Sequence, residues 1–128
     1  MSWKECVDDR LFNTEKVKHA VICMYDGSIW VSSSECPITS TELQVLISKY
    51  QDVPAMSSGG LKAGGQKYIY LSSDLGKGVV RGKFRTSGIH CVMTKLTYIF
   101  CVYEGPTKHE EVAIIVEKVG DYLASIGY

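Results

Sequence analysis

The sequence predicts an α+β fold, in which amphipathic helices cover a central antiparallel sheet. Two features of the 128 residues lead to this prediction. Residues with helical spacing occur near both ends and in one middle segment, and strand-like segments lie between them at intervals of roughly ten residues. Strands joined by short turns pair in antiparallel order, and helices packed on them give a layered domain. The length fits one domain, residues 1–128, with one hydrophobic core.

Three helix starts are predicted by one pattern, a Ser or Thr followed three residues later by Glu. Such a pair of side chains satisfies the free backbone N–H groups at a helix start. The three pairs are Ser2 and Glu5, Thr39 and Glu42, and Thr107 and Glu110. An apolar stripe about four turns long follows the third pair. It consists of Val112, Ile115, Val116, Val119, Leu123 and Ile126.

The middle helix is expected to end before Pro54, because proline disfavours a helical conformation in the residue before it. Residues 57–60, which read Ser-Ser-Gly-Gly, are expected to form a loop.

Six strands are expected from runs of β-branched and aromatic residues between turn signals. They are Val17–Met24, Ile29–Ser32, Lys67–Ser73, Gly78–Phe84, Gly88–Thr94 and Tyr98–Tyr103. Asp26-Gly27 predicts a type I′ hairpin turn between the first two. If residues 95–97 form the loop of the last hairpin, Cys91 and Cys101 face each other across it.

The composition, 45% hydrophobic and 22% charged, is that of a globular protein. The N-terminus lacks the apolar segment of a secretory signal, and the longest aliphatic run, Val112–Val116, is too short to cross a bilayer. The five cysteines are scattered and form no C-x-x-C pair, which indicates reduced thiols rather than disulfides or a zinc site. We therefore expect a soluble cytoplasmic protein.

The net charge is zero but unevenly distributed. Residues 53–103 contain seven basic residues and one acid, a net charge of +6, so the rest of the chain carries −6. A basic middle suits an acidic or polyanionic partner. The alternative is a solvated sheet face with lysines along its edges.

Common catalytic motifs are absent from the sequence: it has no G-x-x-x-x-G-K-[ST], no H-E-x-x-H and no G-x-S-x-G. A Cys–His pair is conceivable, since there are three histidines and five cysteines. However, Cys23, Cys91 and Cys101 lie in strand patterns, where a free cysteine usually acts as a small buried hydrophobe. We expect a binding protein with no catalytic residue, metal or cofactor.

Large aromatic residues stand near both chain ends, where chains usually fray. They are Trp3, Tyr122 and Tyr128, and Trp30 follows the first hairpin turn. Two interpretations remain open. The rings either fill the seam between terminal helices and sheet, or line a groove for a proline-rich peptide, whose left-handed helix leaves its carbonyls free.

Six motifs, in order and over essentially the whole chain, resemble the profilin family. They are Met1-Ser2-Trp3 with Val7-Asp8, Asp26–Trp30, Gly60–Tyr68, Arg81-Gly82-Lys83, Gly88-Ile89 and Val116–Leu123. The resemblance implies a central antiparallel sheet with the N- and C-terminal helices on one face and the middle helix on the other. It also implies a cytoplasmic, cytoskeleton-associated protein that binds monomeric actin, regulates its polymerisation, and binds proline-rich proteins and phosphoinositides. We expect a monomer that does not bind nucleic acid.

The resemblance also implies site residues. Polyproline binding falls on Trp3, Cys6, Trp30, Tyr122 and Tyr128. Actin binding falls on Lys67, Arg81, Lys83, His90 and Lys108. Phosphoinositide binding falls on Lys67, Arg81, Lys83 and Arg85, since arginine clusters recognise phosphates well.

The sequence departs from the family pattern at two places, and the second of them suggests an alternative function. Cys6 stands where the family commonly has Tyr, which predicts a weaker groove or a different ligand register. Cys91-Val92-Met93 stands where plant and amoeboid members often have lysines. The alternative is an adaptor of the same fold that binds proline-rich peptides or lipid headgroups, with weak or no actin binding.

Overall fold

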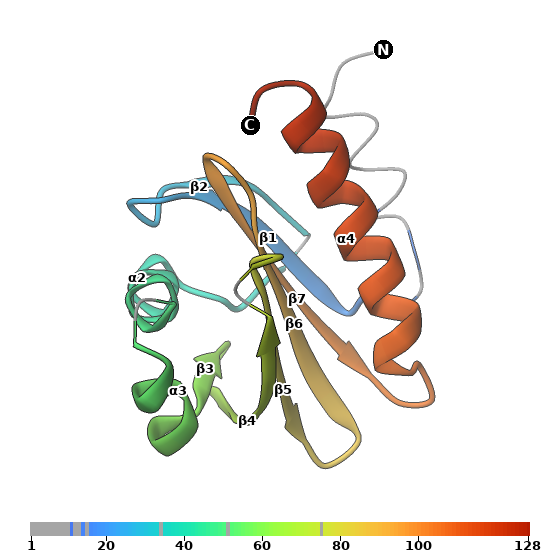
Figure 1. The fold of residues 1–128 in the computed structure, drawn as a ribbon. Coiled ribbons are helices and arrows are strands. Elements are labelled where there is room, and N and C mark those ends of the chain that lie inside the picture. The colour runs from blue at the N-terminus through green and yellow to red at the C-terminus, as the bar shows by residue number, and fades with distance from the viewer. Residues whose placement is uncertain (1–10, 12–13, 15, 34, 51, 75) are drawn as a thin grey trace.

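The structure, a computed structural model, describes residues 11, 14, 16–33, 35–50, 52–74 and 76–128. Across these residues, seven antiparallel strands form one sheet in the order β2-β1-β7-β6-β5-β4-β3, which confirms the predicted sheet (Figure 1). The strands are β1 (His19–Met24), β2 (Ile29–Ser32), β3 (Leu61–Ala63), β4 (Gln66–Asp74), β5 (Val79–Phe84), β6 (Ser87–Met93) and β7 (Thr97–Glu104).

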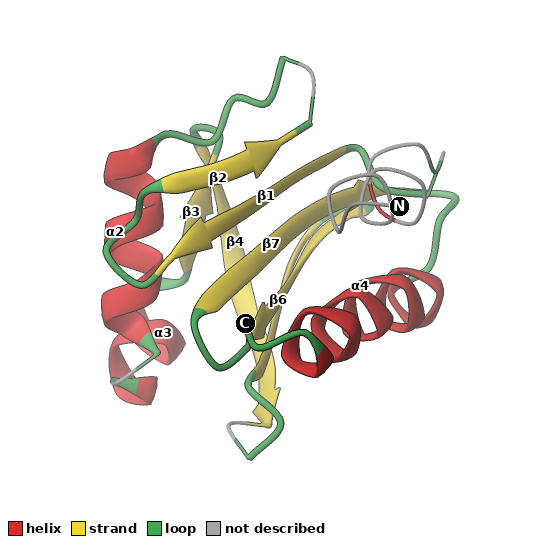
Figure 2. Cartoon of the chain, turned by 90° about the horizontal axis from the view of Figure 1, so that it is seen from above, coloured by secondary structure: helices red, strands yellow, loops and turns green. Residues whose placement is uncertain are grey.

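Helices cover both faces of the sheet. The helices α2 (Ser40–Lys49) and α3 (Val53–Gly59) lie on one face, and α4 (His109–Ser125) lies on the other (Figure 2). The α+β prediction is confirmed for the middle and C-terminal helices. The N-terminal helix predicted from Ser2 and Glu5 lies outside the described residues.

Each face has its own hydrophobic core. On the α2 side, Leu43, Leu46 and Met56 pack with Phe100 and other inward residues of the sheet. On the α4 side, the predicted stripe is buried at Val112, Val116, Val119 and Leu123. Of the other two stripe residues, Ile115 is half-buried, and Ile126, which follows the last residue of α4, is 41% exposed.

The predicted helix start at Thr39 is confirmed. Thr39 Oγ1 accepts a hydrogen bond from the Glu42 N–H (3.2 Å), and the Thr39 N–H donates to Glu42 Oε1 (3.0 Å). The predicted start at Thr107 is wrong. Thr107 closes the turn after β7 by donating its N–H to the Glu104 carbonyl (3.2 Å), so α4 begins one residue later with Lys108 as N-cap.

The short helix α3 was not predicted. Asp52 caps it by accepting from the Ala55 N–H (3.3 Å), and Pro54 sits in its first turn, where a missing N–H costs nothing. Pro54 therefore separates two helices, and residues 57–59 are helical rather than loop.

The hairpin turn between β1 and β2 is not type I′. That type needs positive φ at both central residues. Gly27 has φ +88°, whereas Asp26 is not among the residues with positive φ. The Gly27 N–H donates to the Met24 carbonyl (3.0 Å) and the Met24 N–H to the Ser28 carbonyl (2.9 Å), as in a three-residue turn with a glycine bulge.

The expected pairing of Cys91 with Cys101 is also wrong. Their actual partners are Phe100 for Cys91 and His90 for Cys101, because the hairpin loop is one residue shorter than expected. Since neighbouring positions on a strand point to opposite faces, Cys91 packs on the α2 side and Cys101 on the α4 side.

Candidate functional sites: an aromatic cluster and a basic sheet face

Trp30, Tyr122 and Tyr128 form a group that we call the aromatic cluster. The Trp30 and Tyr128 rings meet edge to face, with centroids 4.6 Å apart and an interplanar angle of 83°. Trp30 reaches this position through a bulge. The β1–β2 register pairs Ile22 with Val31 and Cys23 with Ile29, so Trp30 is the extra residue between them.

The chain end is held in place rather than frayed. The Tyr128 carbonyl accepts from the Leu96 N–H (2.6 Å) and from Thr94 Oγ1 (2.9 Å), both at the β6–β7 turn. The Tyr128 N–H donates to the Leu123 carbonyl at the end of α4 (2.9 Å). Two elements therefore fix the position of the last ring.

The positions of the three described rings are compatible with both interpretations of the aromatic residues. Trp30, Tyr122 and Tyr128 pack against the α4-side core, yet each stays partly exposed. The rings are anchored and still reachable by a ligand. Trp3 and Cys6, the other two predicted residues, lie outside the described residues.

The second surface, which we call the basic face, lies on the α4 side of β4 and β5. Arg81 and Lys83 alternate with buried Val80 and Gly82, so they point to the same side as Val79, which packs under α4. We define the basic face as Lys67, Arg81 and Lys83 on these strands, together with the neighbouring Arg85, from the turn after β5, and Lys108, just before α4.

Exposed apolar side chains accompany the basic residues. Ile69 pairs with Lys83 across β4 and β5 and is 68% exposed, and Leu71 is 54% exposed. Sequence reasoning missed both. Because Ile69 and Leu71 alternate with Tyr68 and Tyr70, the sequence indicates that Ile69 and Leu71 share one face of the strand. Only the β4–β5 register shows that Lys83 lies on the same face.

Three basic residues border one open depression of about 570 Å³. Lys83 and Arg85 come from the end of β5 and the turn after it, and Lys108 comes from the start of α4. Leu71 and Glu110 complete part of its wall. Lys67 lies farther along β4, opposite Lys62 of β3.

His90, the remaining predicted actin residue, is completely buried beneath this surface, beside its strand partner Arg81. Its Nε2 is 3.4 Å from Glu117 Oε2, but neither ring nitrogen is in hydrogen-bond geometry with a described residue. Burial first, then the charges of Arg81 and His109, lowers the pKa of His90 to about 4. A side chain with no accessible surface cannot touch a partner directly, so a role for His90 in actin binding would have to be indirect.

The three buried cysteines are poor candidates for a reactive thiol. Burial raises the pKa of Cys23 to about 12 and raises the pKa of Cys91 and Cys101 as well. A thiol that stays protonated is a poor nucleophile. In the described part of the chain, no group of His, Cys, Asp and Glu side chains could hold a metal ion, and no helix is long and apolar enough to cross a membrane.

Comparison with known proteins places the chain in one family. The family model described as Profilin matches residues 1–128. The profilin of Drosophila melanogaster is 41% identical over 128 residues, with both chains fully covered.

Solved structures agree. The profilin of Schizosaccharomyces pombe superposes with a TM-score of 0.88 at 36% identity, covering 99% of this chain and 100% of that one. Mouse profilin IIa in complex with a double repeat from the FH1 domain of mDia1 has the same fold, with a TM-score of 0.79 at 17% identity and full coverage of both chains. With this sequence match along its whole length and this fold, the chain belongs to the profilin family, a family of non-enzymatic actin-binding proteins.

Proposed function

We propose that this profilin binds monomeric actin through its basic face and proline-rich peptides through its aromatic cluster, and so regulates actin polymerisation in the cytoplasm. The edge-to-face pair of Trp30 and Tyr128 carries the proposal, because it presents two anchored and partly exposed rings on one surface. The two binding surfaces use different residues, so one molecule can engage both partners at once.

The chemistry of the aromatic cluster suits proline-rich peptides. Such peptides form a left-handed helix without internal hydrogen bonds, so their carbonyls need outside donors. Indole N–H and phenol O–H groups supply them, while the ring faces contact the proline rings. The mouse relative of the same fold was solved with a double repeat from an FH1 domain.

The basic face suits an acidic protein surface. Lys83 is exposed beside the exposed side chains of Ile69 and Leu71, so charge and apolar area lie together. Complementary charge speeds and orients association, and apolar contact adds affinity. The adaptor alternative rests on the lack of lysines at residues 91–93. Cys91 is only 1% and Val92 5% exposed, so these two positions offer a partner little surface.

The proposal is tested with purified actin and a decaproline peptide. The protein is expected to slow spontaneous assembly of pyrene-labelled actin, and peptide addition is expected to change its tryptophan fluorescence to saturation. Peptide binding without any effect on actin would establish the adaptor alternative. If neither actin nor decaproline bound, the proposal would be wrong.

A second candidate function, phosphoinositide binding, is favoured by the depression bordered by Lys83, Arg85 and Lys108. Converging cations on one open hollow suit a phosphorylated headgroup. We expect sedimentation with vesicles containing phosphatidylinositol bisphosphate, and much less with phosphatidylserine vesicles of equal surface charge. Equal sedimentation with both would show non-specific charge attraction. Since Lys83 belongs to both surfaces, lipid and actin are expected to compete.

A further inference from the structure

Two aliphatic side chains beside the basic face are unusually exposed. Ile69, at 68%, is the most exposed large hydrophobic residue in the described part of the chain, and Leu71 is 54% exposed. Both belong to β4, which α4 leaves uncovered because it packs mainly on β6 and β7. We call Ile69 and Leu71 the aliphatic pair. Exposed apolar side chains that gather at one place usually mark a contact surface.

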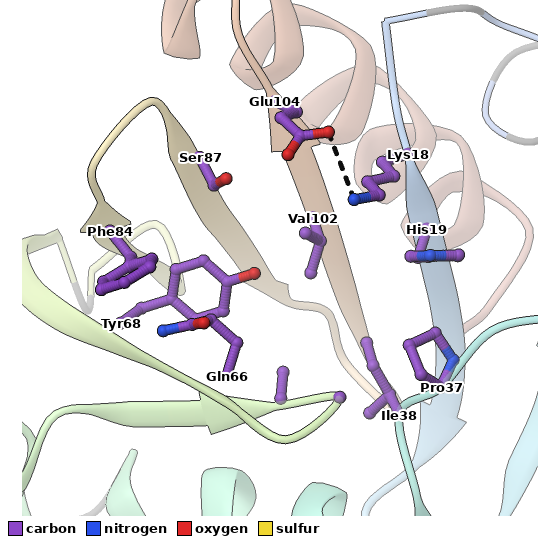
Figure 3. Close-up of a pocket in the computed structure, with 12 residues that line it drawn as sticks. Lys18, His19, Pro37, Ile38, Gln66, Tyr68, Phe84, Ser87, Val102 and Glu104 are labelled. Atoms are coloured by element: carbon purple, nitrogen blue, oxygen red, sulfur yellow. Dashed lines mark ion pairs between the residues drawn. The ribbon is translucent and has the colours of Figure 1, made fainter.

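The opposite face of β4 is packed, which fixes the direction of the aliphatic pair. Tyr68 is buried in the α2-side core, and Tyr70 packs against that core. Figure 3 shows Tyr68 together with Phe84 of β5 in the lining of a pocket on that side of the sheet. Successive side chains of a strand alternate between its faces, so Ile69 and Leu71 point outward on the α4 side. A strand anchored in this way presents them rigidly.

A bulge in β4 releases Leu71 from strand pairing. Tyr70 pairs with Gly82 and Ser72 with Arg81, so Leu71 is the extra residue between them. Its side chain forms part of the wall of the open depression. An aliphatic group therefore stands directly beside the site proposed for a phosphorylated headgroup.

Basic side chains surround the aliphatic pair. Lys83 lies opposite Ile69 across β4 and β5, and Lys67 precedes Ile69 by two positions on the same face of β4. Lys62 pairs directly with Lys67, although like charges at paired positions repel each other. The only acid in β3, β4 and β5 is Asp74, the last residue of β4. An anionic surface laid against these strands would relieve the repulsion.

This combination of charge and apolar area matches the chemistry of an anionic lipid layer, in which phosphates lie above hydrocarbon. A lysine can lay its methylene chain along apolar neighbours while its ammonium group stays among the phosphates. Lys67 and Lys83 flank Ile69 in the arrangement that this requires. Apolar insertion and electrostatic attraction together determine how strongly a protein binds at such an interface.

We propose that the aliphatic pair inserts into the acyl layer of a phosphoinositide-containing membrane while the neighbouring cations bind its phosphates. The inference rests on the phosphoinositide binding proposed above. It adds that the bound protein penetrates the lipid layer, so that the membrane contributes hydrocarbon as well as headgroups to the contact.

Insertion is measured with lipid monolayers. The full chain is injected beneath a monolayer of phosphatidylcholine and phosphatidylinositol bisphosphate held at constant area, and the surface pressure is recorded. We expect the pressure to rise, because inserted side chains add area to the lipid layer. A double variant, Ile69→Ser with Leu71→Ser, is expected to give little or no rise and to bind vesicles of the same lipids about tenfold more weakly.

Two controls accompany the double variant. Val45→Ser removes an exposed aliphatic side chain from α2, on the other face of the sheet, and is expected to match the wild type in both assays. Soluble inositol trisphosphate, which carries the headgroup phosphates without acyl chains, is expected to bind the wild type and the double variant equally in calorimetry.

The outcomes separate insertion from headgroup binding. Vesicle binding by the wild type without a rise in surface pressure would overturn the insertion and leave the headgroup proposal standing. Failure of the wild type to bind vesicles and inositol trisphosphate would overturn both. Unchanged vesicle binding by the double variant, together with a weaker effect on actin assembly, would assign the aliphatic pair to a protein contact and overturn the inference.

Discussion

Trp30 and Tyr128 lie far apart in the sequence, yet their rings meet edge to face with centroids 4.6 Å apart. The contact depends on the bulge that frees Trp30 from strand pairing and on the β6–β7 turn that holds the Tyr128 carbonyl. The proposed peptide-binding surface is thus assembled from a hairpin and the last residue, and neither alone presents both rings.

Replacing Trp30 with alanine should impair binding of decaproline and spare actin. Large buried or half-buried aromatic side chains dominate binding energies, so we expect affinity for the peptide to fall by about 30-fold or more. Isothermal titration calorimetry measures the loss, since the variant has lost one fluorophore. Unchanged slowing of actin assembly is the control, and joint loss of both activities in a folded variant would contradict separate surfaces.

Reversing the charge of Lys83 should have the opposite effect. Lys83→Glu leaves the aromatic cluster intact and repels an acidic partner, so we expect actin affinity to fall about tenfold and to depend less on salt. Lys95→Glu makes the same change on the exposed β6–β7 turn and serves as the control. Equal actin binding by the two variants would argue against the basic face.

Removing the charge of Glu42 should destabilise the protein. Burial alone would raise the pKa of Glu42, but the N–H donors of Gly65, Thr39 and Gly64 together outweigh it and lower the pKa. We expect Glu42→Gln to lower the free energy of unfolding by about 1–2 kcal/mol at pH 7, measured by urea denaturation.

The pH dependence of this destabilisation tests whether the lost charge of Glu42 is its cause. A carboxyl with a lowered pKa contributes stability above its ordinary value of 4.5, and this contribution disappears as the pH falls below it. The difference between wild type and Glu42→Gln should therefore shrink in acid. A constant difference would point to lost packing instead.

His90 should make the fold sensitive to mild acid. Its pKa falls from 6.5 to about 4 on folding, so the unfolded chain binds the proton first. Stability from this group is complete above pH 6.5 and decreases as the pH falls toward 4, by about 3 kcal/mol in all.

The variant His90→Leu should flatten the stability profile over that range, whatever its stability at pH 7. His109→Gln removes the smallest of the three causes of the lowered His90 pKa, so it should reduce the slope only slightly. Urea denaturation from pH 7 to pH 4 gives the three curves. A wild-type slope in His90→Leu would assign the acid sensitivity to other groups.

The described cysteines should react in a defined order. Cys36 is half-buried, whereas Cys23, Cys91 and Cys101 are buried. Under native conditions, iodoacetamide should modify Cys36 well before the other three, as followed by peptide mass spectrometry. An oxidised sample should contain no Cys91–Cys101 disulfide, since the two side chains point to opposite faces of the sheet.

Local patterns determined much of the fold. Thr39 and Glu42 lie within one helical turn, so the sequence alone shows that they can cap a helix. The stripe from Val112 to Leu123 predicts a helix and its buried face, because helical periodicity needs no knowledge of the partner. Short strands in succession predict an antiparallel sheet for the same reason.

The family motifs added what periodicity could not. They predict that Trp30, Tyr122 and Tyr128 share one binding surface, and the structure brings Trp30 and Tyr128 into direct ring contact. No spacing rule relates a hairpin residue to the last residue of the chain.

What only the tertiary structure decided concerns register and burial. A shift of one residue between β6 and β7 separates Cys91 from Cys101 and pairs His90 with Cys101 instead. Such a shift changes the face of every side chain on a strand, and the turn residues leave it open. The burial of His90 and the pocket beside Tyr68 likewise depend on contacts between elements distant in sequence, which local propensity does not encode.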